Sequence, residues 1–212
     1  MASYVEGHGL MAETEPVGLL TESAAGIAVV VLAIIALAGV SSSALLAIAT
    51  IIVGVGLMVQ GFNSAAENVR VGVPGAIPDF GGEVMVDCLA GGTGIVLGIL
   101  ALIGISTAYL LEAALIVFGG TLLLSGAMAM RGPVSTSLGG DVAMVAHRGS
   151  FAAGGMEILI GLAAIVLGIL SLVLHAGVLT MVGFIAVGAS LLLVSATFGS
   201  AMLRVFARTA AD

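Results

Sequence analysis

Three acidic residues that each precede a glycine by four positions are the features of this 212-residue chain most suited to chemistry. They are Glu22 before Gly26, Asp87 before Gly91 and Glu157 before Gly161. Ionisable groups inside a membrane usually mark a site or an ion route, so these acids predict a ring of carboxylates that binds a cation or takes up protons. The competing interpretation places each acid in the first turn of a helix, where it stabilises free backbone N–H groups. Their position at the membrane edge favours this second interpretation.

The composition indicates that lipid surrounds the helices that carry these acids. Hydrophobic residues make up 60% of the chain and charged residues only 8%, with a mean hydropathy of +1.31. A water-soluble core could not bury so much apolar surface, so an all-α integral membrane protein is predicted, with the lipid bilayer as its main partner. A net charge of −7 without any lysine excludes nucleic acid as a partner, because no basic patch can neutralise phosphates.

Six apolar stretches are long enough to cross a hydrocarbon core about 30 Å thick, which needs roughly 17 to 25 residues. They are residues 22–40, 44–62, 84–105, 109–130, 154–174 and 178–203. Very short joints at 41–43, 106–108 and 175–177 make the flanking helices antiparallel neighbours. Segments 63–83 and 131–153 contain proline or clustered glycine and are predicted to be loops. Residues 1–21 form a predicted acidic N-terminal tail, and residues 204–212 a C-terminal tail.

All five arginines fall on the side of the two longer loops and the termini. They are Arg70, Arg131, Arg148, Arg204 and Arg208. The positive-inside rule counts basic residues near helix ends and largely ignores acids. Both termini and both longer loops are therefore predicted to be cytoplasmic, in a multi-pass protein of the cell membrane.

One helical hairpin is repeated three times along the chain. The string IVLGIL occurs at 95–100 and again at 165–170, an offset of 70, and an offset of 65 relates the first hairpin to the second. The same ungapped offsets align the three acids and their glycines. Hairpins at about 22–62, 84–130 and 154–203 then make one transmembrane domain, 22–203. All three enter the membrane from the same side, so they predict a pseudo-threefold bundle and not the inverted repeats of many transporters.

Small residues follow the acids along one face of the first helix of each hairpin. The predicted packing glycines are Gly26, Gly91, Gly94, Gly98, Gly161 and Gly168. At about 3.6 residues per turn, those of one helix lie in a narrow stripe, and such stripes mark places where two helices approach closely. The acids are therefore expected to point toward other helices.

Glu112 differs from the other three acids because the repeat places Ala47 and Val182 at its position. A lone buried acid needs a partner, which favours a site, whereas its place near the start of a helix again favours a dipole role. Polar residues at equivalent positions near the far ends of the second helices are expected to form interhelical hydrogen bonds. They are Gln60, Ser125 and Ser195.

Metal, cofactor and enzymatic chemistry have no support in the sequence. Cys88 is the single cysteine, and neither His147 nor His175 has a second ligand at metal-binding spacing. No nucleotide-binding loop, Ser-His-Asp arrangement or zinc signature occurs. We therefore predict no metal site, no cofactor, no catalytic residues and no enzymatic activity.

The hairpin sequence resembles that of a known family. It consists of GIVLGILALIGI at 94–105, a very short turn, and ALIVFGGTLLLSGAMAM at 114–130. It is similar to the membrane repeat of the acid-resistance HdeD-like proteins, and the similarity extends over residues 22–203. The resemblance implies a small prokaryotic six-helix membrane protein connected with stress, and it brings no catalytic residues.

Three functions remain open from the sequence. The leading hypothesis is a non-enzymatic HdeD-like protein that acts through membrane or protein interactions. A second is a structural or accessory subunit of a larger membrane assembly, with other membrane subunits or further copies of the chain as candidate partners. The third is a proton or cation pathway that uses one acid per repeat.

Overall fold

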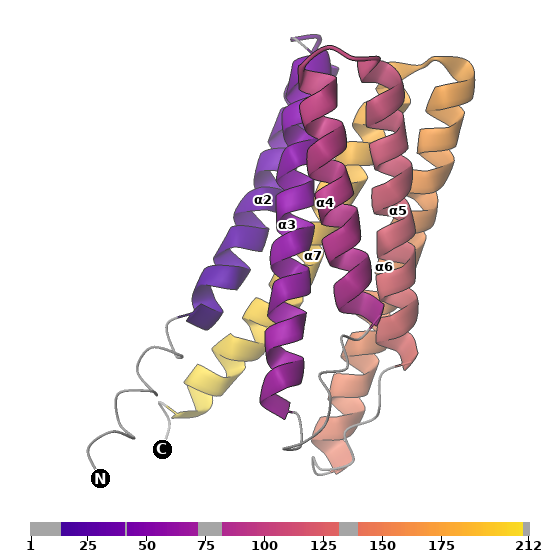
Figure 1. Ribbon diagram of the computed structural model, residues 1–212. Helices are drawn as coiled ribbons and strands as arrows, with labels where there is room; N and C mark the ends of the chain where they lie inside the picture. The colour runs from indigo at the N-terminus through magenta and orange to yellow at the C-terminus, as the bar shows by residue number, and fades with distance from the viewer. Residues whose placement is uncertain (1–13, 41, 72–81, 132–139, 210–212) are drawn as a thin grey trace.

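Six long helices account for the regular structure in this computed structural model. It describes the backbone of residues 14–40, 42–71, 82–131 and 140–209, and the side chains of most residues in 23–62, 82–130 and 154–193. The helices are α2 Thr14–Leu37, α3 Ser42–Val71, α4 Gly82–Leu102, α5 Thr107–Arg131, α6 Gly140–Leu174 and α7 Gly177–Thr209. Successive helices run in opposite directions, and the short turns lie together at the top of Figure 1. The prediction of an all-helical chain is confirmed for these residues.

Four helices extend well beyond the spans that hydropathy marks, and one of them, α7, runs to Thr209, within the predicted C-terminal tail. α2 begins at Thr14, within the predicted tail, and Pro16 lies in its first turn, where proline is tolerated. α3 runs to Val71 and α6 begins at Gly140, so the loop prediction is wrong for 63–71 and 140–153. Hydropathy marks where a helix leaves apolar surroundings. A helix itself ends at residues such as proline and glycine, and 63–71 contains neither.

Left-handed backbone conformations terminate the first helix of each hairpin. Gly39 has φ +88° and Gly104 has φ +92°, a conformation that glycine adopts without strain. The third hairpin has Leu174 at the equivalent position, and there the left-handed residue is His175, with φ +52°. The turn between α6 and α7 therefore has a geometry of its own.

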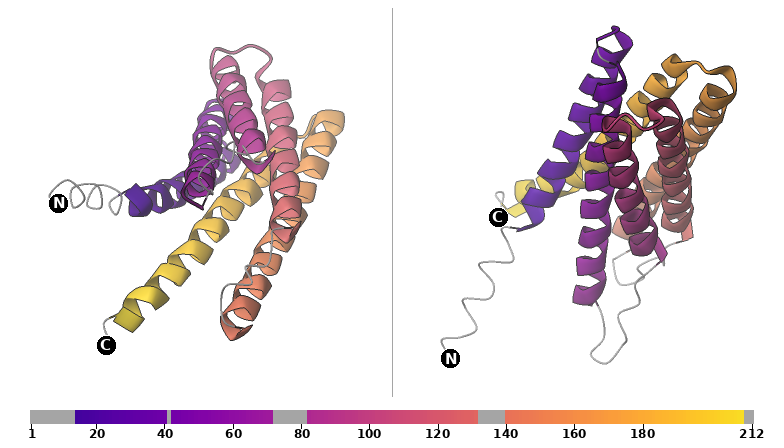
Figure 2. Two further views of the ribbon diagram at one scale, coloured as in Figure 1. Left: turned by 60° about the horizontal axis from the view of Figure 1, so that its bottom comes forward. Right: turned by 45° about the horizontal axis from the view of Figure 1, so that its top comes forward.

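Each hairpin packs against the next one through neighbouring helices. α3 packs on α4 and α5 on α6, while α7 returns to α2, and the two helices of each hairpin also contact each other. Figure 2 shows α7 running alongside α2, which joins the last hairpin to the first. The second helices of the hairpins, α3, α5 and α7, contact one another as well. They form the inner part of the bundle.

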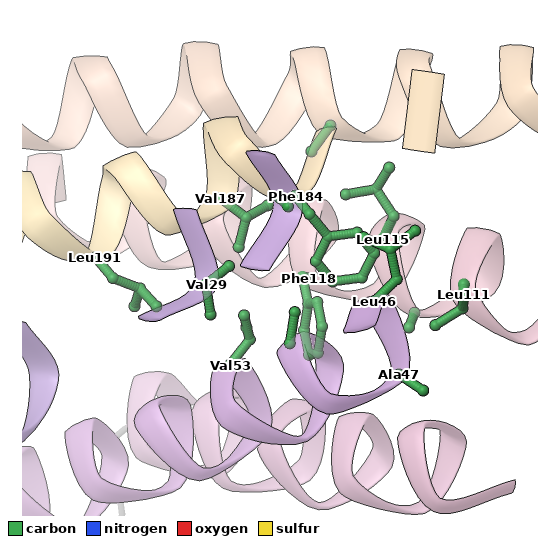
Figure 3. Packing of buried hydrophobic residues seen from close by; sticks show 14 of the residues in the cluster. Val29, Leu46, Ala47, Val53, Leu111, Leu115, Phe118, Phe184, Val187 and Leu191 are labelled. Carbon is green, nitrogen blue, oxygen red and sulfur yellow. The ribbon is translucent and has the colours of Figure 1, made fainter. Parts of the chain in front are cut away.

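Apolar side chains fill the space between the inner helices. Phe118 on α5 and Phe184 on α7 are fully buried, and their rings meet edge to face, with centroids 6.3 Å apart and an angle of 82°. Aromatic rings favour this arrangement. Val29 on α2 and Val53 on α3 belong to the same cluster (Figure 3). The middle of the bundle is therefore a packed core.

Apolar side chains also cover much of the outside. Four helical stretches among the described residues are long and apolar enough to cross a membrane: Ser42–Phe62, Val84–Leu102, Thr107–Met128 and Gly154–Leu174. Shorter apolar stretches occur at Ser23–Leu37 and Gly177–Leu193. Large exposed apolar surfaces of this kind are unstable in water. These helices indicate a membrane-embedded protein.

Candidate functional site

Glycines from neighbouring hairpins face each other where the helices are closest. A methyl group added at Gly91 on α4 would lie 2.5 Å from the carbonyl oxygen of Gly54 on α3. The equivalent pair repeats this contact, since a methyl group at Gly161 would lie 2.5 Å from the carbonyl oxygen of Gly119. Real carbon atoms do not approach oxygen so closely, so only glycine fits these positions. The backbones of adjacent hairpins thus touch directly.

The other four predicted packing glycines also lie against neighbouring helices. A methyl group at Gly98 would meet Ile51 at 2.6 Å, and one at Gly168 would meet Ile116 at 2.7 Å. Gly26 faces Leu192 at 2.9 Å, and Gly94 lies directly against the ring of Phe118. The stripes thus position the first helix of each hairpin, and with it the acid that precedes the stripe.

Asp87 is held between helices. Its side chain is only 2% exposed, and Ser125 Oγ on α5 donates a hydrogen bond of 3.1 Å to its Oδ1. This confirms the interhelical hydrogen bond expected of Ser125. On its other side, Asp87 Cβ lies 3.3 Å from the place that a methyl group at Gly61 on α3 would occupy. The carboxylate therefore lies where α4 meets both α3 and α5.

Glu157 occupies the equivalent place in the third hairpin. Its Cβ lies 3.0 Å from where a methyl group at Gly126 on α5 would be, which matches the position of Asp87 beside Gly61. Its side chain is half-buried, unlike that of Asp87. Glu22 lies on α2, and its side chain is outside the described residues.

The helix bounds do not fit a capping role for these acids. α2 begins at Thr14, well before Glu22, and α6 begins at Gly140, several turns before Glu157. Asp87 also lies beyond the first turn of α4, which begins at Gly82. Free backbone N–H groups belong to the first turn alone, so the first-turn interpretation is wrong for these positions. It failed because these helices begin before the apolar stretches that mark the spans in the sequence.

The predicted ring of carboxylates includes Glu22, whose side chain lies outside the described residues. Within the described residues, no group of three or more His, Cys, Asp or Glu residues lies close enough to hold a metal ion. Asp87 and Glu157 therefore do not join with Glu112 in one cluster. Glu112 lies at the opposite end of the bundle from Asp87 and Glu157.

Glu112 belongs to a polar cluster near the short turns. It is 5% exposed, and Ser171 Oγ on α6 donates a hydrogen bond of 2.9 Å to its Oε1. Ser171 Oγ also lies 2.7 Å from Thr180 Oγ1 on α7 and 3.0 Å from the carbonyl oxygen of Ala176. Three helices thus contribute to the cluster of Glu112, Ser171 and Thr180, which we call the polar triad. A contact with neighbouring helices, more than the dipole of α5 alone, positions the carboxylate.

Ser171 and Thr180 were not identified from the sequence, although the repeat carries a signal for both. Ser171 stands where the other hairpins have Ala36 and Ala101, which are 1% and 3% exposed. Thr180 stands where they have Leu45 and Leu110. At each of these two positions, the third hairpin carries a hydroxyl side chain where both other hairpins carry an apolar one, and this difference could have identified them.

A pocket of about 140 Å³ lies at this end of the bundle, among the first turns of α3, α5 and α7. Its floor consists of equivalent residues from the three hairpins: Leu46, Leu111 and Met181. Its rim is exposed and consists of Ser43, Ala108 and Gly177. Glu112 and Thr180 line its wall, together with Ser42. The pocket therefore combines one carboxylate and several hydroxyls with an apolar floor.

Three other buried hydroxyl groups bond within their own helices. Thr50 and Thr121 donate to the carbonyls of Leu46 and Val117 at 2.7 and 2.9 Å, and Ser190 donates to Val187 at 2.7 Å. Such bonds satisfy a hydroxyl in apolar surroundings without engaging a neighbour. The hydroxyls of Ser125 and Ser171 differ from these because each reaches a carboxylate on another helix.

Comparison with known proteins identifies no family for this chain. The resemblance of its hairpin to the HdeD-like repeat stays a prediction from the sequence at 94–130. No protein-family model matches the chain, and no significant match exists among curated proteins or solved structures.

Proposed function

We propose that the chain is a six-span protein of the cell membrane whose three hairpins form a closed pseudo-threefold bundle. The pattern of helix contacts supports this, because α3 with α4, α5 with α6 and α7 with α2 are the same contact made three times. The length of α2, the first helix of the first hairpin, supports it too. α2 has 24 residues, a length of about 36 Å, which exceeds the hydrocarbon core.

The third junction, between α7 and α2, supports this symmetry but departs from it locally. The position equivalent to Gly54 and Gly119 holds Ala189, whose methyl group does not fit such a contact. The neighbouring Gly188 takes its place, and a methyl group at Gly26 would lie 3.0 Å from the carbonyl oxygen of Gly188. The close contact is therefore kept by a shift of one residue.

The outward faces of the first helices repeat in the same register. At three positions of the repeat, all three hairpins carry the same large exposed aliphatic residue. They are Val31, Val96 and Val166, exposed by 47%, 56% and 51%; Ile34, Ile99 and Ile169, exposed by 52%, 45% and 49%; and Leu37, Leu102 and Leu172, exposed by 46%, 52% and 39%. Identical residues that are exposed in three equivalent places suit a common apolar solvent, which is lipid.

Within the membrane, the protein acts without catalysis, through interactions with lipid or with other proteins, as its resemblance to the HdeD-like proteins implies. The packed centre is the observation that carries this choice over a proton or cation pathway. Phe118 and Phe184 are fully buried where a route between the inner helices would have to pass. Conduction needs a polar or water-filled passage, and an edge-to-face aromatic pair offers none.

Flux measurements in proteoliposomes test this choice. The wild-type protein should show no more proton or cation flux than empty liposomes, because the centre is filled. Flux that disappears in a triple variant with Glu22→Gln, Asp87→Asn and Glu157→Gln, with the fold retained, would establish the pathway and overturn the proposal.

An accessory subunit is a second candidate function, and the exposure of α6 favours it. Only 22% of the Gly154–Leu174 span is buried, compared with 56% of Thr107–Met128. Leu159 and Val173 on α6 are 67% and 66% exposed. Purification in mild detergent followed by mass spectrometry distinguishes the two functions. A stoichiometric partner protein would support the accessory role, and a solitary oligomer of this chain would contradict it.

A further inference from the structure

The polar triad breaks the symmetry of the bundle. At the two equivalent junctions, its positions hold only apolar residues: Ala47, Ala101 and Leu110 at one, and Val182, Ala36 and Leu45 at the other. At the junction of α3, α4 and α5, Ala47 and Ala101 are 0% and 3% exposed, so this junction packs closely without these polar groups, whereas Val182 at the other junction is 42% exposed. Folding of the hairpins therefore does not require Glu112, Ser171 and Thr180. A buried carboxylate that the fold does not need calls for another explanation.

One oxygen of the Glu112 carboxylate is open to the pocket. Ser171 donates to Oε1, and among the described residues the structure records no hydrogen bond to Oε2. No buried side-chain oxygen in that part of the chain lacks a partner, so Oε2 is not sealed inside the protein. Since Glu112 lines the pocket and is 5% exposed, Oε2 faces this space.

Among the described side chains, none that is cationic pairs with this oxygen. The chain has no lysine, and Arg131 terminates α5 at the end opposite Glu112. The other arginines also lie near the helix ends that are remote from the short turns: Arg70 on α3, Arg148 on α6, and Arg204 and Arg208 on α7. His175, in the nearby turn, is exposed and places its ring against Tyr109, with centroids 6.4 Å apart. Buried carboxylates are stabilised by partners; Ser171 supplies one at Oε1, and Oε2 has room for a second from outside the chain.

The pocket sets the size and shape of that partner. Its volume of about 140 Å³ is close to that of a cavity of roughly 150 Å³ that admits benzene. Leu46, Leu111 and Met181 offer an apolar floor, while Glu112 and Thr180 offer oxygen atoms on the wall. An ammonium group donates up to three hydrogen bonds, and a short alkyl chain fits the floor.

The surrounding helix ends restrict where a positive charge can lie. The first turns of α3, α5 and α7 surround the pocket, and each helix start carries roughly half a positive elementary charge. These helix ends stabilise the negative charge of Glu112, so a cation can be held here only in direct contact with its carboxylate. We propose that this pocket binds a small alkylammonium ligand, with its ammonium group on Glu112 Oε2 and its alkyl chain on the floor.

Isothermal titration calorimetry of the full chain in lipid nanodiscs tests the proposal with n-butylammonium chloride. Excess sodium chloride screens weak attraction to the membrane surface. The wild-type protein should show saturable binding at one site, and n-butanol, which lacks the charge, should show none. Absence of saturable n-butylammonium binding would overturn the proposal, as would equal binding of n-butanol.

Variants locate the binding site. Glu112→Gln should weaken binding by about tenfold or more, the loss expected when a charge-assisted hydrogen bond is removed. Asp87→Asn is the matched control, because Asp87 is also buried and hydrogen-bonded to a serine but lies at the other end of the bundle. It should leave the affinity unchanged. Equal loss in both variants, or none in Glu112→Gln, would contradict a site at Glu112.

A second pair of variants keeps the test valid if Glu112→Gln is poorly folded. Glu112→Ala and Thr180→Leu introduce the residues that the junction of α3, α4 and α5 already accommodates, as Ala47 and Leu110. Both should fold with a wild-type melting temperature. Glu112→Ala should abolish n-butylammonium binding, and Thr180→Leu should weaken it by removing a wall hydroxyl. Full binding by folded Glu112→Ala would overturn the proposal.

Discussion

Ser125 on α5 donates a hydrogen bond of 3.1 Å to Asp87 Oδ1 on α4, and both side chains are buried. The bond joins the two helices of the second hairpin near the ends remote from their short turn. Removal of the hydroxyl leaves a buried carboxylate with one donor fewer, which is costly because water cannot replace it.

Ser125→Ala should therefore lower the free energy of unfolding by about 1 to 3 kcal/mol. Unfolding in detergent, followed by circular dichroism, measures the change. Thr121→Val on the same helix is the control, because the Thr121 hydroxyl bonds only to the carbonyl of Val117 at 2.9 Å. Equal destabilisation by both substitutions would show that the bond to Asp87 contributes no more to the free energy of unfolding than a bond within one helix.

Gly91 and Gly92 make a matched pair for testing the close helix contact. A methyl group at Gly91 would lie 2.5 Å from the Gly54 carbonyl oxygen, whereas one at Gly92 would meet nothing within 4 Å. Gly91→Ala should force α3 and α4 apart and destabilise the bundle, by about 1 to 3 kcal/mol as for other overpacked interiors. Gly92→Ala should be neutral or stabilising by up to about 1 kcal/mol, because alanine favours the helix. Similar melting temperatures for the two variants would contradict the glycine contact.

The aromatic pair at the centre carries a separate prediction. Phe184 is fully buried against Phe118, so Phe184→Ala leaves a cavity and should cost about 3 to 5 kcal/mol of unfolding free energy. Phe62, which is 60% exposed, provides the control, and Phe62→Ala should change stability by less than about 1 kcal/mol. Thermal unfolding of both variants in the same detergent measures the difference. A larger loss for Phe62→Ala would place the packing centre elsewhere.

The helix count and the glycine contacts could be predicted from sequence because both depend on local periodicity. Gly91 and Gly161 were identified by their spacing from Asp87 and Glu157, and spacing along a helix fixes which residues share a face. The partner of each glycine could not be predicted in this way. That Gly54 faces Gly91 depends on how one hairpin docks on the next, which no single helix encodes.

The role of the acids was the weakest part of the sequence interpretation, for two physical reasons. Hydropathy placed the helix starts at the membrane edge, whereas α6 begins at Gly140, so Glu157 is far from any free N–H group. The second reason concerns Glu112, whose partner Ser171 lies 59 positions along the chain on another helix. Only the comparison of Ser171 with Ala36 and Ala101 could have revealed it in advance.

The orientation of the bundle leads to the last prediction. Ser43 lies at the start of α3 among the short turns and Gly82 at the start of α4, at the opposite end, and both are exposed. In a Cys88→Ala background, a membrane-impermeant maleimide added to intact cells should label a Ser43→Cys variant and leave a Gly82→Cys variant unlabelled. The arginines cluster on the Gly82 side, and positively charged segments are retained in the cytoplasm. After the cells are opened, both variants should react, which controls for the reactivity of each thiol. Labelling of Gly82→Cys alone in intact cells would invert the topology and would place the Glu112 pocket on the cytoplasmic side.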